Sequence, residues 1–394
     1  MKFIKNLLLL LLLVLLASFF RDRMLMTTFA TRSANMSEVY TLSSMSVLAI
    51  DVLLLLFVIW SKPSFSKWSK KVLYLLIYLL IISLLFNTGS RLSYLLAFLP
   101  ILSFLGFRAI ISMVDEKLFF YLYVPFSFFV AFSFFESHTL LQFIAEDNFV
   151  MNTVFSVIYL LPLILCLNGK IVGKLSLFKW LYLALIVISI LYSGKRSPFI
   201  SVFAALAVYY YIIKIKFEKS QVTKSLLLVG TVLVGYLGLQ YILFQSDFYL
   251  VERLSSMQQD HGSGRTEVWA MAWKVICQSD FLPLIIGHGT DSLCVAPGNN
   301  LGYPAHNDFL ECIYDYGIIG FCLYLSLHIA LIKKTLSLIH IKSYFAAPMA
   351  MSYVIFLVSS MVSHILIYEY YLMVFCMFWA YVDVVRSREV NKFN

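Results

Sequence analysis

The sequence has few charged side chains. Asp, Glu, Lys and Arg make up only 13% of its 394 residues and 61% are hydrophobic, whereas a soluble domain carries about 25% charged residues. With a mean hydropathy of +0.87, the chain has too little polar surface to be a water-soluble globule. It also lacks a C-x-x-C pair and a phosphate-binding glycine loop, which argues against a thiolate metal site and a nucleotide site.

Long apolar runs occupy most of the chain, and a run of about 20 such residues spans the hydrocarbon core of a bilayer as a helix. We therefore predict an all-α polytopic membrane protein with about twelve membrane helices. The predicted spans are 4–20, 40–60, 72–87, 92–112, 118–135, 149–168, 177–193, 198–213, 225–244, 309–332, 344–364 and 368–385. The first run follows Lys2 and Lys5, as in a signal peptide. Because it lacks a small-residue cleavage site, a retained helix is the favoured interpretation and cleavage the alternative.

The distribution of Lys and Arg predicts the topology, because these residues favour cytoplasmic loops. With the N-terminus inside, 21 of the 30 Lys and Arg residues fall on the cytoplasmic side. Both termini are then cytoplasmic. The chain divides into N-terminal membrane helices (1–244), an extracytoplasmic loop with short amphipathic helices (245–308) and C-terminal membrane helices (309–394). The net charge of +9 is spread over short loops, which argues against nucleic-acid binding.

Three arginines on the outer side follow Gly or Ser, directly or one residue later, in a short polar segment: Arg91 in NTGSR, Arg196 in YSGKRSP and Arg265 in GSGR. Pro198 suits the first turn of a helix, and the N-terminus of a helix attracts anions. Arg196 therefore predicts an anion site, since a guanidinium group grips phosphate oxygens at two points. For Lys195, contact with lipid headgroups is the favoured interpretation and anion binding is the alternative.

The segment DHGSGRTEVW precedes a run with one apolar face and two tryptophans. This pattern predicts an amphipathic helix along the outer membrane surface, where Trp is enriched. Arg265 falls in its first turn beside Glu267, and Trp269 follows. Arg265 either binds an anion or forms a salt bridge with Glu267.

The segment PAHNDFLECIYDYGIIG places His306, Asn307, Asp308 and Glu311 within six residues. The unperturbed pKa of a histidine lies near neutrality, so His306 suits proton transfer. Asn307 or His306 can cap the helix that follows. Asp308 and Glu311 either orient His306 or serve as helix caps, and the two later glycines allow a bend and close packing. Together with the arginines, His306 predicts an anion-binding, proton-transferring site on the outer face.

These segments resemble the signature of the O-antigen polymerase and O-antigen ligase superfamily, membrane glycosyltransferases of the GT-C type. SGRTEVW, followed some 40 residues later by HNDFLE and YDYGIIG, is similar to the paired motif of the superfamily. YSGKRSPFI is similar to its earlier small-Ser-Arg turn. The motifs cover 193–200 and 262–321. Lys195 stands where the family has Ser before Arg, so the alignment of Arg196 is open by one position, and Arg91 has no family counterpart.

The resemblance implies a multi-pass protein of the bacterial inner membrane with a periplasmic active site. Its partners would be an undecaprenyl-pyrophosphate-linked oligosaccharide, membrane lipids, and a chain-length regulator and flippase of the same pathway, with no cofactor, metal or nucleic acid. Arg196 and Arg265 match the arginines that hold the pyrophosphate, and His306 matches the histidine that activates the acceptor hydroxyl in an inverting, metal-independent transfer. The remaining candidates are Arg91 and Lys195 for substrate binding and Asn307, Asp308, Glu311, Glu267 and Trp269 as supporting residues.

Three functions remain open at this point. A polymerase joins lipid-linked repeat units of O-antigen, capsule or exopolysaccharide, and the arrangement of the two motifs favours it over a ligase, which transfers finished glycan to lipid A-core. A lipid-linked glycan flippase is less favoured, because no internal repeat is evident and the residues that can carry chemistry cluster at the outer face, with Asp51 in the second predicted span as the main exception. A Cys277–Cys294 disulfide is compatible with an outer loop, but the spacing does not imply it.

Overall fold

The computed structural model describes residues 2–29, 36–61, 65–86, 91–144, 154–193, 195–216, 264–300, 302 and 304–391. Every regular element within these ranges is a helix, which confirms the predicted all-α class. Seven of the described helices are long and apolar enough to cross a membrane, and three further apolar helices are shorter. The chain is therefore a multi-pass membrane protein. The predicted span 225–244 lies outside the described residues.

The first half of the chain forms a group of long helices that pack side by side. α1 packs against α2 and α5, α2 packs against α4, and α5 packs against α9. The bounds are α1 Lys2–Phe29, α2 Met36–Ile59, α3 Lys67–Phe86, α4 Arg91–Met113, α5 Glu116–Ile144, α9 Phe178–Ser193 and α10 Arg196–Tyr210, which continues as the π-helical η2 Tyr211–Lys216. Buried Leu, Ile and Phe side chains of these helices join one apolar core with those of the C-terminal helices.

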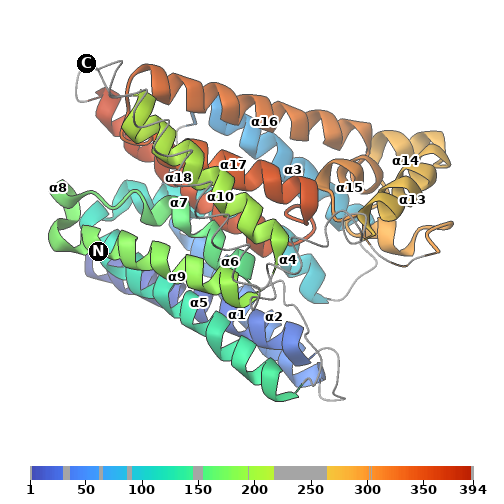
Figure 1. The fold of residues 1–394 in the computed structure, drawn as a ribbon, viewed down its shortest axis with the longest axis horizontal. Coiled ribbons are helices and arrows are strands. Elements are labelled where there is room, and N and C mark those ends of the chain that lie inside the picture. The colour runs from blue at the N-terminus through green and yellow to red at the C-terminus, as the bar shows by residue number, and fades with distance from the viewer. Residues whose placement is uncertain are drawn as a thin grey trace, which may run out of the picture.

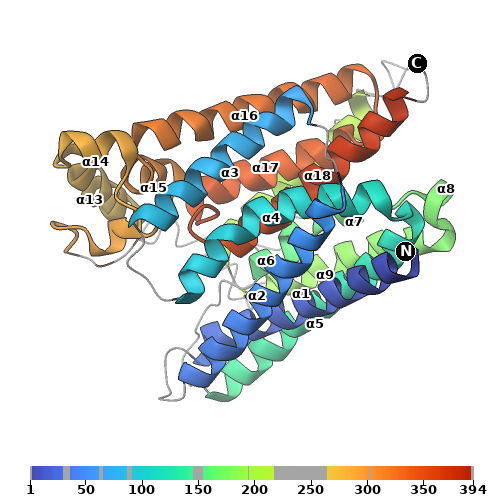
Figure 2. The ribbon, with the colours of Figure 1, turned by 180° about the vertical axis from the view of Figure 1, so that it is seen from behind.

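The C-terminal helices pack against elements of the first half. They are α16 Gly317–His340, α17 Ala346–Val362 and α18 Glu369–Asn391. α16 packs against α3, α17 against α10, and α18 against α4. In the sequence, four short helices that the structure describes separate the two halves. They are α13 Arg265–Cys277, α14 Phe281–Ile286, η4 Ser292–Val295 and α15 Asp308–Asp315. Figures 1 and 2 show α13, α14 and α15 at one end of the helix bundle, with the start of α1 and the end of α18 at the opposite end.

Two predicted spans differ from the structure. The predicted span 149–168 contains two short helices, α6 Val154–Tyr159 and α7 Leu161–Ile164, followed by α8 Gly169–Val172 and the 3₁₀ helix η1 Gly173–Leu177. Pro162 lies in the first turn of α7, where it has no N–H to continue the preceding helix. The predicted span 309–332 begins too early, because α15 ends at Asp315 and the membrane helix α16 runs from Gly317 to His340.

A buried ion pair joins α4 to α18. Arg108 and Asp383 are in contact and are 4% and 2% exposed. Ser66 also donates a hydrogen bond to Asp383 at 2.6 Å, and the Arg108 guanidinium lies 4.8 Å from the ring centre of Phe65. A buried charge is tolerated only when it is paired and hydrogen-bonded, so this cluster fixes how the two helices pack. Asp51 is buried in α2 without a hydrogen-bond partner among the described residues.

Candidate functional site

α13 begins at Arg265 and ends at Cys277, after a turn through Gly264, whose φ is 72°. Its buried residues Ala272, Val275 and Ile276 pack in a small cluster with Leu293 and Tyr314, from η4 and α15. The apolar face of α13 therefore packs against the rest of the protein, whereas the sequence predicted that this face would contact the membrane surface. The indole Nε1 of Trp269 donates a hydrogen bond to the Ala305 carbonyl at 2.9 Å, which holds α13 against the segment that carries His306.

α15 begins immediately after His306, and its first turn explains the polar cluster in the sequence. Asn307 is the N-cap, and its side-chain oxygen accepts hydrogen bonds from the N–H groups of Phe309 and Leu310 at 3.0 and 3.3 Å. His306 precedes this cap with a φ of 52°, in the left-handed region that L-residues rarely adopt. The Glu311 carboxyl reaches back and accepts the His306 N–H at 2.8 Å. Glu311 therefore holds the backbone of His306, while Asn307 caps the helix.

Asp308 has a different role from Glu311, because its carboxyl holds the loop between α17 and α18. Its carboxyl accepts hydrogen bonds from the N–H groups of Ile365 at 3.0 Å and Leu366 at 3.3 Å. Asp308 is fully buried, and burial raises the pKa of its carboxyl well above the ordinary value. This anchor brings His364, the preceding residue, next to α15.

His364 is a site residue that the sequence motifs did not single out. Its Nδ1 lies 2.9 Å from Glu311 Oε2, and both side chains are 1% exposed. Its ring centre lies 4.2 Å from that of His306. The only local signal in the sequence is a lone polar SH pair between two apolar runs, which is too common a pattern to predict a role.

Asp315 closes α15 at the other end and organises the segment after α14. Its carboxyl accepts hydrogen bonds from the N–H groups of Asp291 and Leu293 at 3.0 and 3.1 Å and from the Ser292 hydroxyl at 2.8 Å. Asp315 is fully buried, and burial raises its pKa well above the ordinary value. Nearby, the ring of His288 stacks on Tyr314 with 4.0 Å between ring centres. These contacts make the loop a folded part of the site.

Two of the predicted basic residues, Lys195 and Arg265, lie near His306, and Arg196 lies near Arg265. Lys195 is the N-cap of α10 and Arg196 its first residue, just as Arg265 is the first residue of α13. Burial lowers the pKa of Arg265, and the charge of Arg196 lowers it further. Burial also lowers the pKa of His306 to about 3, with further contributions from His364, Arg265 and Lys195. Burial, together with the charges of Arg265 and Lys195, therefore keeps His306 neutral at physiological pH.

The alternative of a salt bridge between Arg265 and Glu267 is not observed. Glu267 is exposed on α13, and Arg265 forms no ion pair with any carboxylate in the part of the chain that the structure describes. Arg91 is the first residue of α4, but its side chain lies outside the described residues. Cys277 and Cys294 are both free thiols, so the disulfide that the sequence left open is not formed.

A close crossing of backbone at two glycines fixes the far end of α15. Gly287 and Gly317 have φ values of 103° and 68°, and a Cβ on either would lie 2.3 Å from a carbonyl oxygen, of Asp315 and Ile285 respectively. The Tyr78 hydroxyl donates to the carbonyls of Ile286 and Tyr316 at 2.9 and 3.1 Å. The bend and close packing that the sequence predicted at Gly317 and Gly320 are present, since a Cβ on Gly320 would also lie 2.4 Å from Tyr316 Cβ. α14 is therefore held against the start of α16.

Gly317→Ala is expected to lower the unfolding temperature of the detergent-solubilised protein more than Gly173→Ala. Gly173 has a similar φ of 58° but no atom within 4 Å of an added Cβ, so that control measures backbone strain alone, about 1–2 kcal/mol. The difference between the variants then reports the clash with the Ile285 carbonyl. Size-exclusion chromatography after a temperature series gives the midpoints. Equal midpoints for the two variants would contradict the close crossing.

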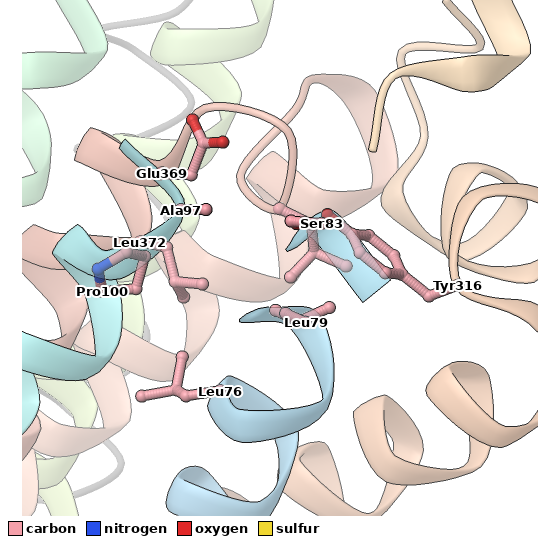
Figure 3. Close-up of a pocket in the computed structure, with 9 residues that line it drawn as sticks. Leu76, Leu79, Ser83, Ala97, Pro100, Tyr316, Glu369 and Leu372 are labelled. Carbon is pink, nitrogen blue, oxygen red and sulfur yellow. The ribbon is translucent and has the colours of Figure 1, made fainter. Parts of the chain in front are cut away.

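A small cavity lies beside this crossing, between α3, α4 and α18. Figure 3 shows Leu76, Leu79 and Leu372 on its wall, with Ser83, Tyr316 and Glu369 supplying the polar atoms. It has room for about one water molecule and contains none of the predicted site residues. The Ser83 and Tyr316 hydroxyls both contact Thr290, at 2.6 and 3.0 Å, so the cavity supports the loop after α14 and is too small to bind a glycan.

Residues 181–325 match the family model described as O-Antigen ligase. This part of the chain therefore carries an O-antigen ligase-like domain, which agrees with the superfamily predicted from the motifs. The matched range contains Lys195, Arg196, Arg265 and His306 with the α15 residues around it, but it ends before His364. No curated protein matches the chain.

Proposed function

We propose that the protein is a membrane glycosyltransferase that transfers a glycan from a polyprenyl-pyrophosphate carrier to an acceptor hydroxyl. The observation that carries this proposal is the neutral His306 near Lys195 and Arg265, with Arg196 near Arg265, in a domain that matches the O-Antigen ligase family model. A site of this kind binds a polyvalent anion and still holds a free base. Both arginines are first residues of helices, where the helix dipole also favours an anion.

The charge of the leaving group explains the basic residues. When the bond between the anomeric carbon and pyrophosphate breaks, its electron pair passes to a phosphate oxygen and negative charge grows there. Guanidinium groups already in place stabilise that charge more in the transition state than in the ground state. The acceptor oxygen attacks from the opposite face of the sugar, so the anomeric configuration inverts.

His306 receives the proton of the acceptor hydroxyl in this reaction. At neutral pH its ring is uncharged because burial and the neighbouring cations lower its pKa, so a nitrogen lone pair is free. A bound pyrophosphate offsets the field of those cations, and a nearby negative charge raises the pKa of a base. Donor binding therefore makes His306 a stronger base when the acceptor needs it. Asn307, Glu311 and Trp269 hold the segment around His306 in place.

We favour a polymerase, in which donor and acceptor are both undecaprenyl-pyrophosphate-linked oligosaccharides, on the arrangement of the two motifs in the sequence. A ligase that transfers the glycan to lipid A-core is the second candidate, because the matched family model carries that description. Either enzyme would lie in the bacterial inner membrane with the site on the periplasmic face and both termini in the cytoplasm. The position of α13–α15 at the end of the bundle opposite the start of α1 and the end of α18 supports this orientation (Figure 1).

Lipopolysaccharide banding on a gel tests the function in a strain from which the gene is deleted. A lipid A-core that carries one repeat unit is the expected result for a polymerase. Bare core with long lipid-linked polymer indicates the ligase. A ladder that is the same in the deletion strain, the wild type and the complemented strain contradicts both O-antigen activities. A flippase forms no glycosidic bond. Purified protein that transfers glycan from its lipid carrier to lipid-linked glycan or to lipid A-core, without a membrane gradient, is therefore a polymerase or a ligase and not a flippase.

A further inference from the structure

The pair formed by His364 and Glu311 is the part of the site that the proposed reaction does not yet use. His364 lies on the loop between α17 and α18, outside the matched range 181–325. Its Nδ1 contacts Glu311 Oε2 at 2.9 Å, and its Nε2 is buried without a partner among the described residues. Glu311 is therefore the group that fixes the His364 ring by hydrogen bonding.

Glu311 contacts both histidines at once. Its Oε1 accepts the His306 N–H at 2.8 Å while its Oε2 contacts His364. The two imidazole rings touch, with 4.2 Å between centres and 45° between planes. His306 needs this support because its left-handed φ of 52° is unfavourable for an L-residue. One carboxyl thus fixes the backbone of His306 and, through His364, one face of its ring.

The loop that carries His364 is itself anchored to α15. The buried Asp308 carboxyl accepts the N–H groups of Ile365 and Leu366, which directly follow His364 in the chain. Asp308 and Glu311 lie one turn apart on α15, so a single short helix positions both histidines. A ring that served only to fill space would not need a hydrogen bond and an anchored loop of this kind.

We propose that His364 and Glu311 are positioning residues for His306, which fix its orientation toward the acceptor hydroxyl and tune its basicity with pH. This inference rests on the proposed transferase function. His306 makes the contact with the acceptor, and the pair acts through His306. Besides His306, the titratable and charged groups that face the pair are Arg265 on α13, Asp291 and Cys294 at η4, Asp308, Cys312 and Asp315 on α15, and Tyr368 before α18. Lys195, before α10, acts on His306.

Protonation of the pair gives the pH dependence its sign. Burial raises the pKa of Glu311 to about 8 and lowers the pKa of His364 to about 4. Between these values both groups are neutral, and the protonated carboxyl donates from Oε2 to His364 Nδ1. As the pH rises through 8, Glu311 loses its proton and places a negative charge beside His306. That charge makes His306 a stronger base, so the transfer rate is expected to rise with pH in this range.

Glu311→Gln and His364→Phe test the inference in the purified full-length protein, with a polyprenyl-pyrophosphate-linked oligosaccharide as donor and acceptor. The amide of Glu311→Gln can accept the His306 N–H and donate to His364, so kcat at pH 7 should fall less than in His364→Phe, whereas the rise through pH 8 should vanish. His364→Phe keeps a ring against His306 but loses the hydrogen bond. Its kcat should fall about tenfold with KM within about threefold.

His364→Gln is the rescue variant, because its amide can donate to or accept from Glu311 in either protonation state, and its kcat should recover most of the loss. His340→Ala is the matched control, since His340 is exposed at the far end of α16. A rise through pH 8 that persists in Glu311→Gln, or a wild-type kcat in His364→Phe, overturns the inference. Wild-type protein that forms no glycosidic bond overturns the proposed function instead. Should His364→Phe fail to elute as a folded protein, Glu311→Gln and the wild-type pH profile decide the question.

Discussion

Arg265→Ala is expected to lower kcat for glycan transfer by about 10²–10³-fold, the effect of removing one preorganised donor from a developing oxyanion. Arg265 is the first residue of α13, is half-buried, and forms no ion pair with a described carboxylate. Burial and the neighbouring charge of Arg196 already lower its pKa. Holding the two charged guanidinium groups near each other without an anion is therefore energetically unfavourable. A bound pyrophosphate offsets that cost most when its charge is greatest, at the transition state.

Two further variants separate charge in general from the position of this charge. Lys274→Ala removes a cation from the last turn of the same helix, where the side chain is exposed, and should leave kcat within about threefold, as expected of a screened surface charge. Arg265→Lys keeps the charge but loses the two-point grip on phosphate oxygens, so its kcat should fall between those of Ala and wild type. Initial rates across donor concentrations give kcat and KM separately. An equal loss in Lys274→Ala and Arg265→Ala would show that only the general positive field matters.

The membrane helices could be predicted from the sequence because their signal is local. A run of apolar residues long enough to span the bilayer forms a helix whatever the rest of the chain does, and the described long helices fall where such runs occur. The errors lie where tertiary contacts compete with the apolar pattern. Pro162 ends the first part of the predicted span 149–168. The crossing at Gly317 separates α15 from α16 although apolar residues continue through it.

The site residues also differ in whether a local sequence pattern reveals them. Lys195, Arg196, Arg265 and His306 stood out because each lies in a polar segment that interrupts the apolar pattern, and the structure brings them into one electrostatic neighbourhood. His364 lies 53 positions from Glu311 in sequence, so no spacing rule connects them. The contact exists only because Asp308 anchors the loop to α15, which is a property of the fold.

The roles of Asp308 and Glu311 were open in the sequence for a related reason. Both acids fall in the first turn of a helix, where either can act as a cap or interact with the helix dipole. The structure gives the cap to Asn307 and directs Glu311 to the His306 N–H and Asp308 to the α17–α18 loop. Which of these contacts an acid makes depends on the loop opposite it, and a single helical segment does not encode that loop.

His306→Asn is expected to lower kcat by about 10²–10⁴-fold, the range for loss of a general base. Asn is chosen because it tolerates the left-handed backbone far better than Ala does, and His306 has a φ of 52°. The variant therefore removes the ring nitrogens while the segment keeps its turn into α15. Donor affinity should change little, since the arginines that would hold the pyrophosphate are untouched. Rates and donor binding on the same preparation test both halves of this expectation.

His306→Ala is the companion variant, because it adds backbone strain to the loss of the base. A larger fall in unfolding temperature for Ala than for Asn, with a similar loss in kcat, would assign the catalytic effect to the imidazole and the stability effect to the turn. Transfer within about threefold of wild type in His306→Asn would mean that another group takes the acceptor proton. His364 is then the group to test, since its ring lies against His306 and its Nδ1 is already bound to Glu311. In that case His306→Asn combined with His364→Phe should abolish transfer, although His306→Asn alone does not.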